Sequence, residues 1–318
     1  MNPLDLVVKA TVYPGLTFVV ALALLLEAVE RKVAARLQSR IGPSYTGLGG
    51  LLQPLIDLLK LLGKEDLAPR SQDLVAVPAA LIWSLSLAAF ASLFIPWSGA
   101  VGFSFHGDAV LVAACLTLSL GLLYLAAFST HSPYSVIGGF RLLGLLASYE
   151  IALLSLLGIV YAVTGSLSLA EIRRTLWSGL AAEPVFLPLW LAGAVLGFVL
   201  ILAETGKDPF SVAEAETEIA GGLMADMSGR RLAFAHLTHR IQETVSLYYY
   251  TTLFLAPPWS GIAGLLTLLG AGLAVAIAAT LVDAAAPRLR LVDVGRASWT
   301  VIVPCSFIIA ALALIVRG

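Results

Sequence analysis

Acidic side chains gather in one connection of a chain that otherwise carries little charge. Residues 203–231 read AETGKDPFSVAEAETEIAGGLMADMSGRR and lie between two long apolar stretches. The carboxylates of this connection are Glu204, Asp208, Glu214, Glu216, Glu218 and Asp226. Polar groups without partners are not tolerated against lipid. These carboxylates therefore lie against protein, against water in a solvated loop, or on a path for cations, and these interpretations stay open.

The local pattern predicts a short helix inside this acidic connection. Pro209 ends the preceding helix. Ser211 followed by Glu214 fits a capping box, so we expect a new helix to begin at Ser211. Gly221 and Gly222 are expected to end it.

Two side chains of this expected helix share a face. Glu214 and Glu218 are four residues apart and therefore lie together, whereas Glu216 points elsewhere. A further carboxylate, Glu150, falls inside an apolar run that reads ASYEIALL. A short carboxylate cannot reach the membrane surface, so it needs a buried partner, water or a proton. Glu150 is either functional or a polar contact between packed helices.

Charged and imidazole side chains also occur near the ends of apolar segments. They are Glu27, Glu30, Arg240, Glu243, His236 and His239. The two histidines are three residues apart and share a helix face. Two histidines alone are a weak metal signal, because protein zinc sites need three or four converging ligands. We assign them no metal.

The composition indicates an all-α, polytopic membrane protein. The chain has 318 residues, of which 59% are hydrophobic and 12% charged, far from the average of soluble domains. The net charge of −1 gives no electrostatic support for a nucleic-acid partner. The N-terminus, MNPLDLVVKA, lacks the basic region of a signal peptide, so we expect the first helix to stay as an anchor.

We expect a single membrane domain over residues 1–318 with about eight spanning helices of the length a bilayer needs. The expected spans are 10–29, 74–95, 109–130, 142–163, 185–204, 233–256, 260–282 and 298–316. The connections on one side, about 30–73, 131–141, 205–232 and 283–297, together with adjacent helix ends carry fifteen Lys and Arg, against four on the other side. By the positive-inside rule these loops are cytoplasmic and both termini lie outside a multi-pass cell-membrane protein.

The first of these loops contains an amphipathic segment. Leu51 to Gly63 reads LLQPLIDLLKLLG, in which Gln53, Asp57 and Lys60 form a narrow polar stripe. The segment is too short to span a bilayer. It either lies along the interface as a surface anchor or packs on partner helices.

The two cysteines, Cys115 and Cys305, lie in separate apolar segments and no C-x-x-C occurs. Iron–sulfur clusters and structural zinc sites need several converging thiolates or imidazoles. We therefore expect this chain to bind no cofactor itself. If the assembly carries out redox chemistry, its metals belong to other subunits.

Several runs together carry a family resemblance. They are ERKVAARLQSRIGP (30–43), GLLQPLIDLLKLLGKED (50–66), GGFRLLGLLASYEIAL (138–153), AETGKDPFSVAEAETEIAGG (203–222), MSGRRLAFAHL (227–237) and PRLRLVDVGRASW (287–299). In this order, over almost the whole chain, they resemble the H-subunit (subunit 1) family of complex I, the NADH:quinone oxidoreductase. The same family supplies a subunit of energy-converting membrane-bound hydrogenases.

The resemblance implies a role in a large assembly. Such subunits anchor the peripheral iron–sulfur and catalytic subunits on the cytoplasmic side, contact antiporter-like and small membrane subunits, and begin a proton path. Nickel–iron or flavin centres belong to partners, and quinone-reducing members form most of the quinone tunnel. Residues matching the peripheral-arm interface or a quinone-like cavity are Arg36, Arg40, Asp57, Asp208 and Asp226. Residues matching the proton or charge relay are Glu150, Glu204, Glu214, Glu216 and Glu218.

This chain departs from the quinone-reducing pattern at three places. It has PFS at 209–211 where PFD is usual, DMSG at 226–229 where EYSG is usual, and LTHR at 237–240 where LAEY is usual. The resemblance therefore favours the hydrogenase-type, ferredoxin-linked branch, with a quinone reductase as the alternative. A stand-alone ion transporter and a passive anchor remain further alternatives. Whether protons or sodium ions move stays open.

Overall fold

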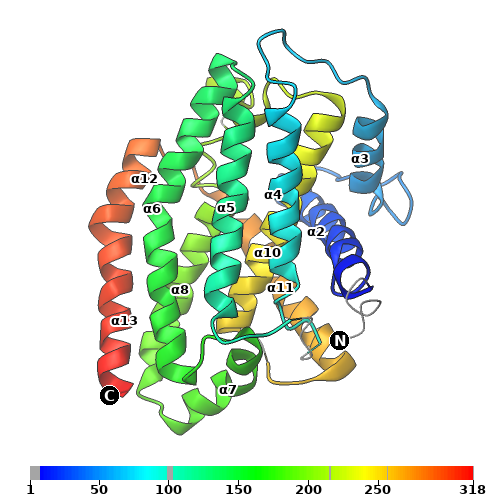
Figure 1. The fold of residues 1–318 in the computed structure, drawn as a ribbon. Helices are drawn as coiled ribbons and strands as arrows, with labels where there is room; N and C mark the ends of the chain where they lie inside the picture. Colours follow the sequence, from blue (N-terminus) through cyan, green and yellow to red (C-terminus); the bar gives the residue numbers. More distant parts are fainter. Residues whose placement is uncertain (1–7, 99–102, 215, 256, 318) are drawn as a thin grey trace.

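The computed structural model describes residues 8–98, 103–214, 216–255 and 257–317, with all side chains in these ranges except those of 216 and 217. The described residues form helices and connections without a β-strand, and the long helices run side by side in one bundle (Figure 1). The all-α class expected from the sequence is confirmed.

Six stretches of the described chain are long and apolar enough to cross a membrane. They are Val8–Leu37, which contains α2 (Leu16–Leu37), then α5 (Asp108–Phe128), α6 (Pro133–Thr164), α8 (Phe186–Glu204), α11 (Gly261–Ala285) and Leu291–Arg317. The last stretch joins α12 (Leu291–Ala297), the π-helical η2 (Ser298–Ile302) and α13 (Val303–Arg317). The shorter α4 (Ala76–Ser92) and the more polar α10 (Gly229–Phe254) complete eight elements, which match the eight expected spans.

Helix α10 lies at the centre of the bundle and packs on α2, α4, α8 and α11. Every residue from Ile241 to Phe254 is buried. Because these positions face other helices rather than lipid, they tolerate Thr and Tyr side chains whose hydroxyls bond to backbone carbonyls. The peripheral α13 shows the opposite pattern, with mostly apolar side chains and many of them exposed.

Some expected boundaries were wrong. The predicted loop 131–141 is mostly the first turns of α6, which begins at Pro133, because proline suits the first turn of a helix. Gly138 and Gly139 do not break this helix. They let α6 approach other parts of the chain closely, since a Cβ at Gly138 would collide with the backbone of Gly222 and Leu223. Helix α12 likewise lies inside the predicted loop 283–297.

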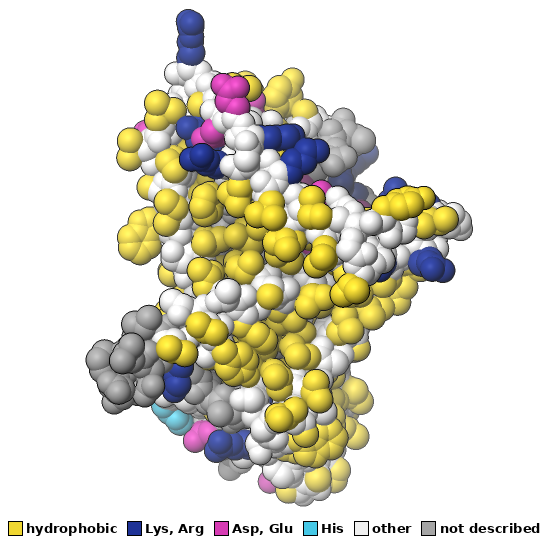
Figure 2. Space-filling model, turned by 90° about the vertical axis from the view of Figure 1, so that its right-hand side faces the viewer, with side chains coloured by type: hydrophobic (Ala, Val, Ile, Leu, Met, Phe, Trp, Pro, Cys, Tyr) yellow, Lys and Arg dark blue, Asp and Glu magenta, His cyan; other side chains and the backbone are white. Residues whose placement is uncertain are grey.

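The amphipathic segment forms α3 (Gln53–Gly63), as expected. It contacts α2 and α10 and lies beside the bundle (Figure 1). Its leucines are largely exposed, while Gln53 donates a hydrogen bond to Asp57 at 2.8 Å. Figure 2 shows hydrophobic side chains in a band across the middle of this face of the molecule, with charged side chains toward its two ends.

The helix expected from Ser211 does not form. The connection contains a single turn of helix, α9 (Glu216–Ile219), and a 3-10 turn, η1 (Gly222–Met224). The Ser211 hydroxyl is not a helix cap, because it donates to Asp208 and accepts a hydrogen bond from Arg288 at 2.8 Å. Gly221, with a φ of 93°, follows the end of α9, in line with the glycine stop signal.

A helix that the sequence did not predict, α7 (Leu169–Ala182), lies at the opposite end of the bundle from α3 (Figure 1). Its Arg173 is buried and donates to backbone carbonyls of two connections, at Trp97 and Pro257, and to the carbonyl of Gly264 in the first turn of α11. These bonds pair backbone carbonyl oxygens with a hydrogen-bond donor, as buried backbone groups require.

Candidate functional site

The acidic connection borders a cavity of 430 Å³ between α2, α10 and the segment that follows α11. Its lining is mostly polar. The charged members are Glu27, Glu30, Arg31, Lys207, Asp208, Glu214, Arg240, Glu243, Asp283 and Arg288. We call the end of the bundle that holds this cavity, α3 and residues 205–228 the basic end.

Seven side chains form a central charged cluster, defined here as Glu27, Glu30, Arg31, Asp57, Lys207, Arg240 and Glu243. At its centre, Lys207 Nζ lies 2.6 Å from Glu243 Oε1 and 3.1 Å from Glu30 Oε1. Arg240 Nη1 lies 2.7 Å from Glu243 Oε2 and 3.6 Å from Glu30 Oε2. Each cation thus bridges α10 to α2.

Different elements supply these groups. Glu27, Glu30 and Arg31 share a face of α2 through their spacing of three and four residues, and Arg240 and Glu243 are three apart on α10. Lys207 follows the end of α8, where its backbone N–H caps the helix by bonding to Leu202. The cluster therefore exists because three distant segments meet at the ends of their helices.

Opposing effects act on Lys207. Burial disfavours the charged ammonium, but the nearby carboxylates of Glu243 and Glu30 outweigh burial and hold the pKa of Lys207 above its ordinary value. Lys207 is therefore charged at neutral pH. It neutralises carboxylates that have little access to water.

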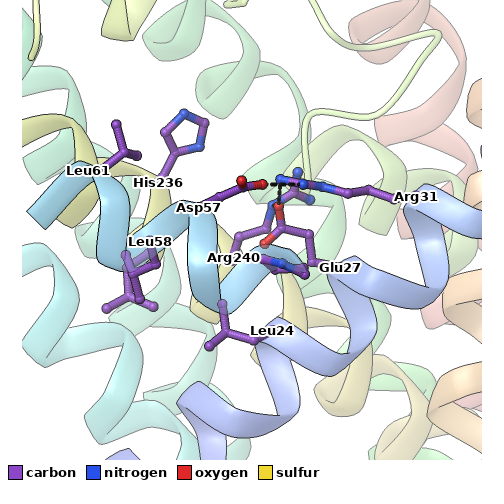
Figure 3. A pocket seen from close by; sticks show the side chains of 10 residues that line it. Leu24, Glu27, Arg31, Asp57, Leu58, Leu61, His236 and Arg240 are labelled. Atoms are coloured by element: carbon purple, nitrogen blue, oxygen red, sulfur yellow. Dashed lines mark hydrogen bonds and ion pairs between the residues drawn. The ribbon is translucent and has the colours of Figure 1, made fainter. Parts of the chain in front are cut away.

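Asp57 connects α3 to the cluster. Figure 3 shows the carboxylates of Asp57, from α3, and Glu27, from α2, both pointing toward Arg31. Arg31 lies 2.5 Å from Glu27 and 2.6 Å from Asp57. Partial burial raises the pKa of Asp57, yet hydrogen bonds from Arg31 and Gln53 outweigh it, so the pKa lies below the ordinary value.

The same side chains line a smaller pocket of 150 Å³ between α2, α3 and α10 (Figure 3). Its polar wall includes Asp57 and His236, and its apolar wall includes Leu24, Leu58 and Leu61. This pocket shares Glu27, Arg31 and Arg240 with the larger cavity, so the two spaces adjoin.

Deeper in the bundle, Glu204 ends α8 and is buried. One carboxylate oxygen accepts a hydrogen bond from Ser246 at 2.9 Å, and the other has no partner among the described residues. A space of 30 Å³ lies between Glu204 and Glu214, and Gly206 and His239 line both it and the larger cavity. Glu204 therefore lies one small space away from the polar cavity.

Glu150 lies near the middle of α6, half-buried beside Thr117 and within electrostatic reach of Glu204. The three carboxylates Glu214, Glu204 and Glu150 thus lead from the connection into the bundle. Glu214 lies 3.9 Å from His239 Nε2.

Other expected relay residues lie elsewhere. Glu218 points away from the cavity and forms a 2.6 Å ion pair with Arg141, so Glu214 and Glu218 do not share a helix face. The reason is the missing helix between Ser211 and α9. The side chain of Glu216 lies outside the part of the chain that the structure describes.

The expected interface residues separate into two groups. Asp208 and Asp226 are tied to the chain, since Asp208 accepts from Ser211 and lies 3.6 Å from Arg288, and Ser135 donates to Asp226 at 3.3 Å. Arg36 and Arg40 are exposed, and neither forms an ion pair with a described residue. Their role in docking stays a prediction.

Within the described ranges, no group of three His, Cys, Asp or Glu side chains is arranged to bind a metal ion. The sequence shows charged residues at 27, 30, 240 and 243, but it does not reveal that they form ion pairs with one another or that Lys207 joins them. The available signal was a spacing of three on both α2 and α10.

Comparison with known proteins gives a consistent result. A model of the family described as NADH dehydrogenase matches residues 10–314. The H subunit of NADH-quinone oxidoreductase from Thermomicrobium roseum is 34% identical over 310 residues, covering 91% of this chain and 89% of that protein. The corresponding H subunit from Syntrophotalea carbinolica is 32% identical and covers 94% of each chain.

A solved structure described as the membrane-bound sulfane sulfur reductase, an archaeal respiratory membrane complex, has the same fold. Its TM-score is 0.82 over 99% of both chains, at 24% identity. The fold and the site define a polytopic helical membrane protein with a buried charged cluster at one end. More particularly, the chain belongs to the NADH dehydrogenase family of complex I H subunits, as the sequence resemblance indicated.

Proposed function

We propose that this chain is the membrane-arm subunit of a complex-I-like redox complex in the cell membrane. It anchors the peripheral redox subunits at its basic end and couples electron transfer to ion movement across the bilayer. The basic end faces the cytoplasm and both termini face outside, in keeping with the fifteen Lys and Arg counted on that side. The names of the curated relatives support membership of a multisubunit oxidoreductase.

One observation carries the coupling role: one carboxylate oxygen of the buried Glu204 has no partner among the described residues, and a small space separates it from the polar cavity. A carboxylate inside the membrane needs a partner, water or a proton. When charge arrives at the basic end, a proton or a shift in field can pass from the cavity through Glu214 to Glu204 and Glu150. We assign these three to the relay and keep Glu216 as a candidate on family grounds.

Glu218 is a weaker candidate for the relay. It is half-exposed and paired with Arg141, so its charge is screened by water and by a fixed partner. Its ion pair with Arg141 instead links the acidic connection to α6.

The test is Glu204→Gln and Glu150→Gln, which keep shape and hydrogen bonding but remove titration. In membrane vesicles carrying the assembled complex, both variants are expected to lower ion pumping per electron transferred. Glu218→Gln is the matched control and should pump normally. Parental pumping by both variants, in a fully assembled complex, would show that these carboxylates are structural.

Quinone reduction is the second candidate for the reaction at the arm interface. The pocket in Figure 3 combines a polar wall with an apolar wall, which suits a ligand with a polar headgroup and an apolar tail. The hydrogenase-type branch rests on the departures at 209–211, 226–229 and 237–240. Purifying the complex, identifying its subunits and assaying bound nickel separates the two.

A further inference from the structure

A further pocket, in addition to the three spaces described above, lies apart from the central charged cluster, where α4 and α10 begin. Its volume is 240 Å³. Its lining residues are Asp66, Pro78, Leu81, Ile82, Arg230, Arg231 and Phe234. None of these residues lines the three spaces described above, so the pocket is a separate site.

The mouth of this pocket is cationic. Arg230 is exposed and forms no ion pair within the described residues. Arg231 Nε lies 3.2 Å from Asp66 Oδ2, while its Nη1 is buried and has no hydrogen-bond partner in the part of the chain that the structure describes. Two arginines thus face one carboxylate. Both also lie in the first turn of α10, where the helix dipole is unfavourable for cations and favourable for an anion.

The floor of the pocket is apolar. Phe234 follows Arg230 by four residues, so it lies one turn, about 6 Å, further along α10. Pro78, Leu81 and Ile82 share a face of α4 by their spacing. Ile82 is 53% exposed and the neighbouring Trp83 is 65% exposed, so the described chain leaves this side of α4 uncovered. The pocket therefore opens onto an uncovered apolar surface below a cationic mouth.

The third wall is held in place by the chain after α3. The Ser228 hydroxyl accepts from the Leu67 N–H at 2.8 Å and donates to the Leu67 carbonyl at 2.7 Å. Gly229 touches the same segment so closely that a Cβ would collide with the Glu65 carbonyl. These contacts fix Asp66 and the first turn of α10 relative to each other, so the pocket is preformed.

We propose that this pocket binds an anionic phospholipid from the surrounding bilayer. The phosphate lies between Arg230 and Arg231 and takes up their spare hydrogen-bond donors. An acyl chain follows Phe234 and Ile82 into the membrane. A free phosphate or an acidic segment of a partner subunit would use the arginines but would leave the apolar floor open, so the lipid accounts for more of the pocket.

The test uses the assembled complex, purified in detergent and mixed with phosphatidylcholine micelles that contain phosphatidylglycerol. Bound phosphatidylglycerol is measured for Arg230→Gln and for the paired change Arg231→Gln with Asp66→Asn, which leaves no orphan charge. Arg230→Gln removes a net positive charge and is expected to weaken binding about fivefold, equivalent to ~1 kcal/mol per cation near an anionic surface. The paired change keeps the local net charge and removes only the hydrogen-bond donors of Arg231, so it should weaken binding by less than Arg230→Gln does. Arg290→Gln, an exposed arginine outside the pocket, is the matched control and should bind normally.

A photoreactive benzophenone residue in place of Ile82 identifies the occupant directly. A phospholipid adduct that diminishes in Arg230→Gln supports the proposal. An adduct with another subunit instead would assign the pocket to a protein contact. Displacement of phosphatidylglycerol by inorganic phosphate, with no lipid adduct at position 82, would assign it to a free anion. Equal binding in all variants would also overturn the proposal.

Discussion

Lys207→Met should destabilise the assembled complex strongly, although it removes a single charge. The side chain is 10% exposed and its ammonium contacts Glu243 at 2.6 Å and Glu30 at 3.1 Å. Methionine retains an apolar chain of similar length but leaves the two carboxylates without this cation. Removing one partner of a buried ion pair typically costs about 3–5 kcal/mol.

A second substitution that restores the charge balance of the cluster should restore stability. The central charged cluster holds three cations against four carboxylates, and Lys207→Met leaves two against four. Adding Glu30→Gln restores the original excess of one carboxylate. The double variant should therefore recover most of the lost stability, because replacing both members of a buried pair is often close to neutral.

The assay is thermal unfolding of the purified complex, followed by loss of assembly. Lys64→Met, an exposed lysine at the same end, is the control and should unfold like the parent. The pKa of Lys207 is raised in the folded state, so its contribution is fully present below its ordinary pKa of 10.5 and is lost as pH rises through the folded value. The titration of Lys207 itself should therefore add no pH dependence to the parent–variant difference between about pH 6 and 9. A double variant as unstable as Lys207→Met would refute the charge-balance argument.

Three further outcomes are expected. Ser246→Ala leaves the buried Glu204 without its hydrogen bond and should cost about 1–3 kcal/mol in thermal unfolding, whereas Ser246→Thr should cost less; equal losses would show that the bond to Glu204 contributes nothing. Arg36→Glu and Arg40→Glu should release the peripheral subunits in size-exclusion chromatography while the membrane part stays folded, because both side chains are exposed; a parental elution profile would remove them from the docking surface. The isolated subunit should retain no stoichiometric iron, nickel or flavin by elemental analysis and absorbance, and retention of any of these would contradict the prediction.

Apolar periodicity predicted the helices well because lipid imposes the same requirement on every exposed span. The eight expected segments all correspond to long helices, and the amphipathic segment before residue 64 forms α3. Errors occur where a local signal competes with a tertiary contact. The capping box at Ser211 was one such case, since Arg288 and Asp208 bind the hydroxyl that would have capped a helix.

The candidate site was predictable in part. Glu150, Glu204 and Glu214 were recognised by type and by position, and they form a series that leads inward from the connection. The importance of Lys207 was not visible, because its neighbours Glu30 and Glu243 are far away in the sequence. Helix α7 was missed since its pattern is short and amphipathic. Its buried Arg173 donates to backbone carbonyls of two distant connections and of the first turn of α11.

Composition and residue order alone predict a helical membrane protein of this family, with an acidic connection and a basic end. Those properties depend on local composition and order, which need no knowledge of contacts. The tertiary structure decided which charges neutralise one another, that Glu218 turns to Arg141 while Glu214 faces the cavity, and where Arg230 and Arg231 meet an apolar floor. The physical reason is that a charge in low-dielectric surroundings is governed by groups within a few ångströms, and helix packing sets those neighbours.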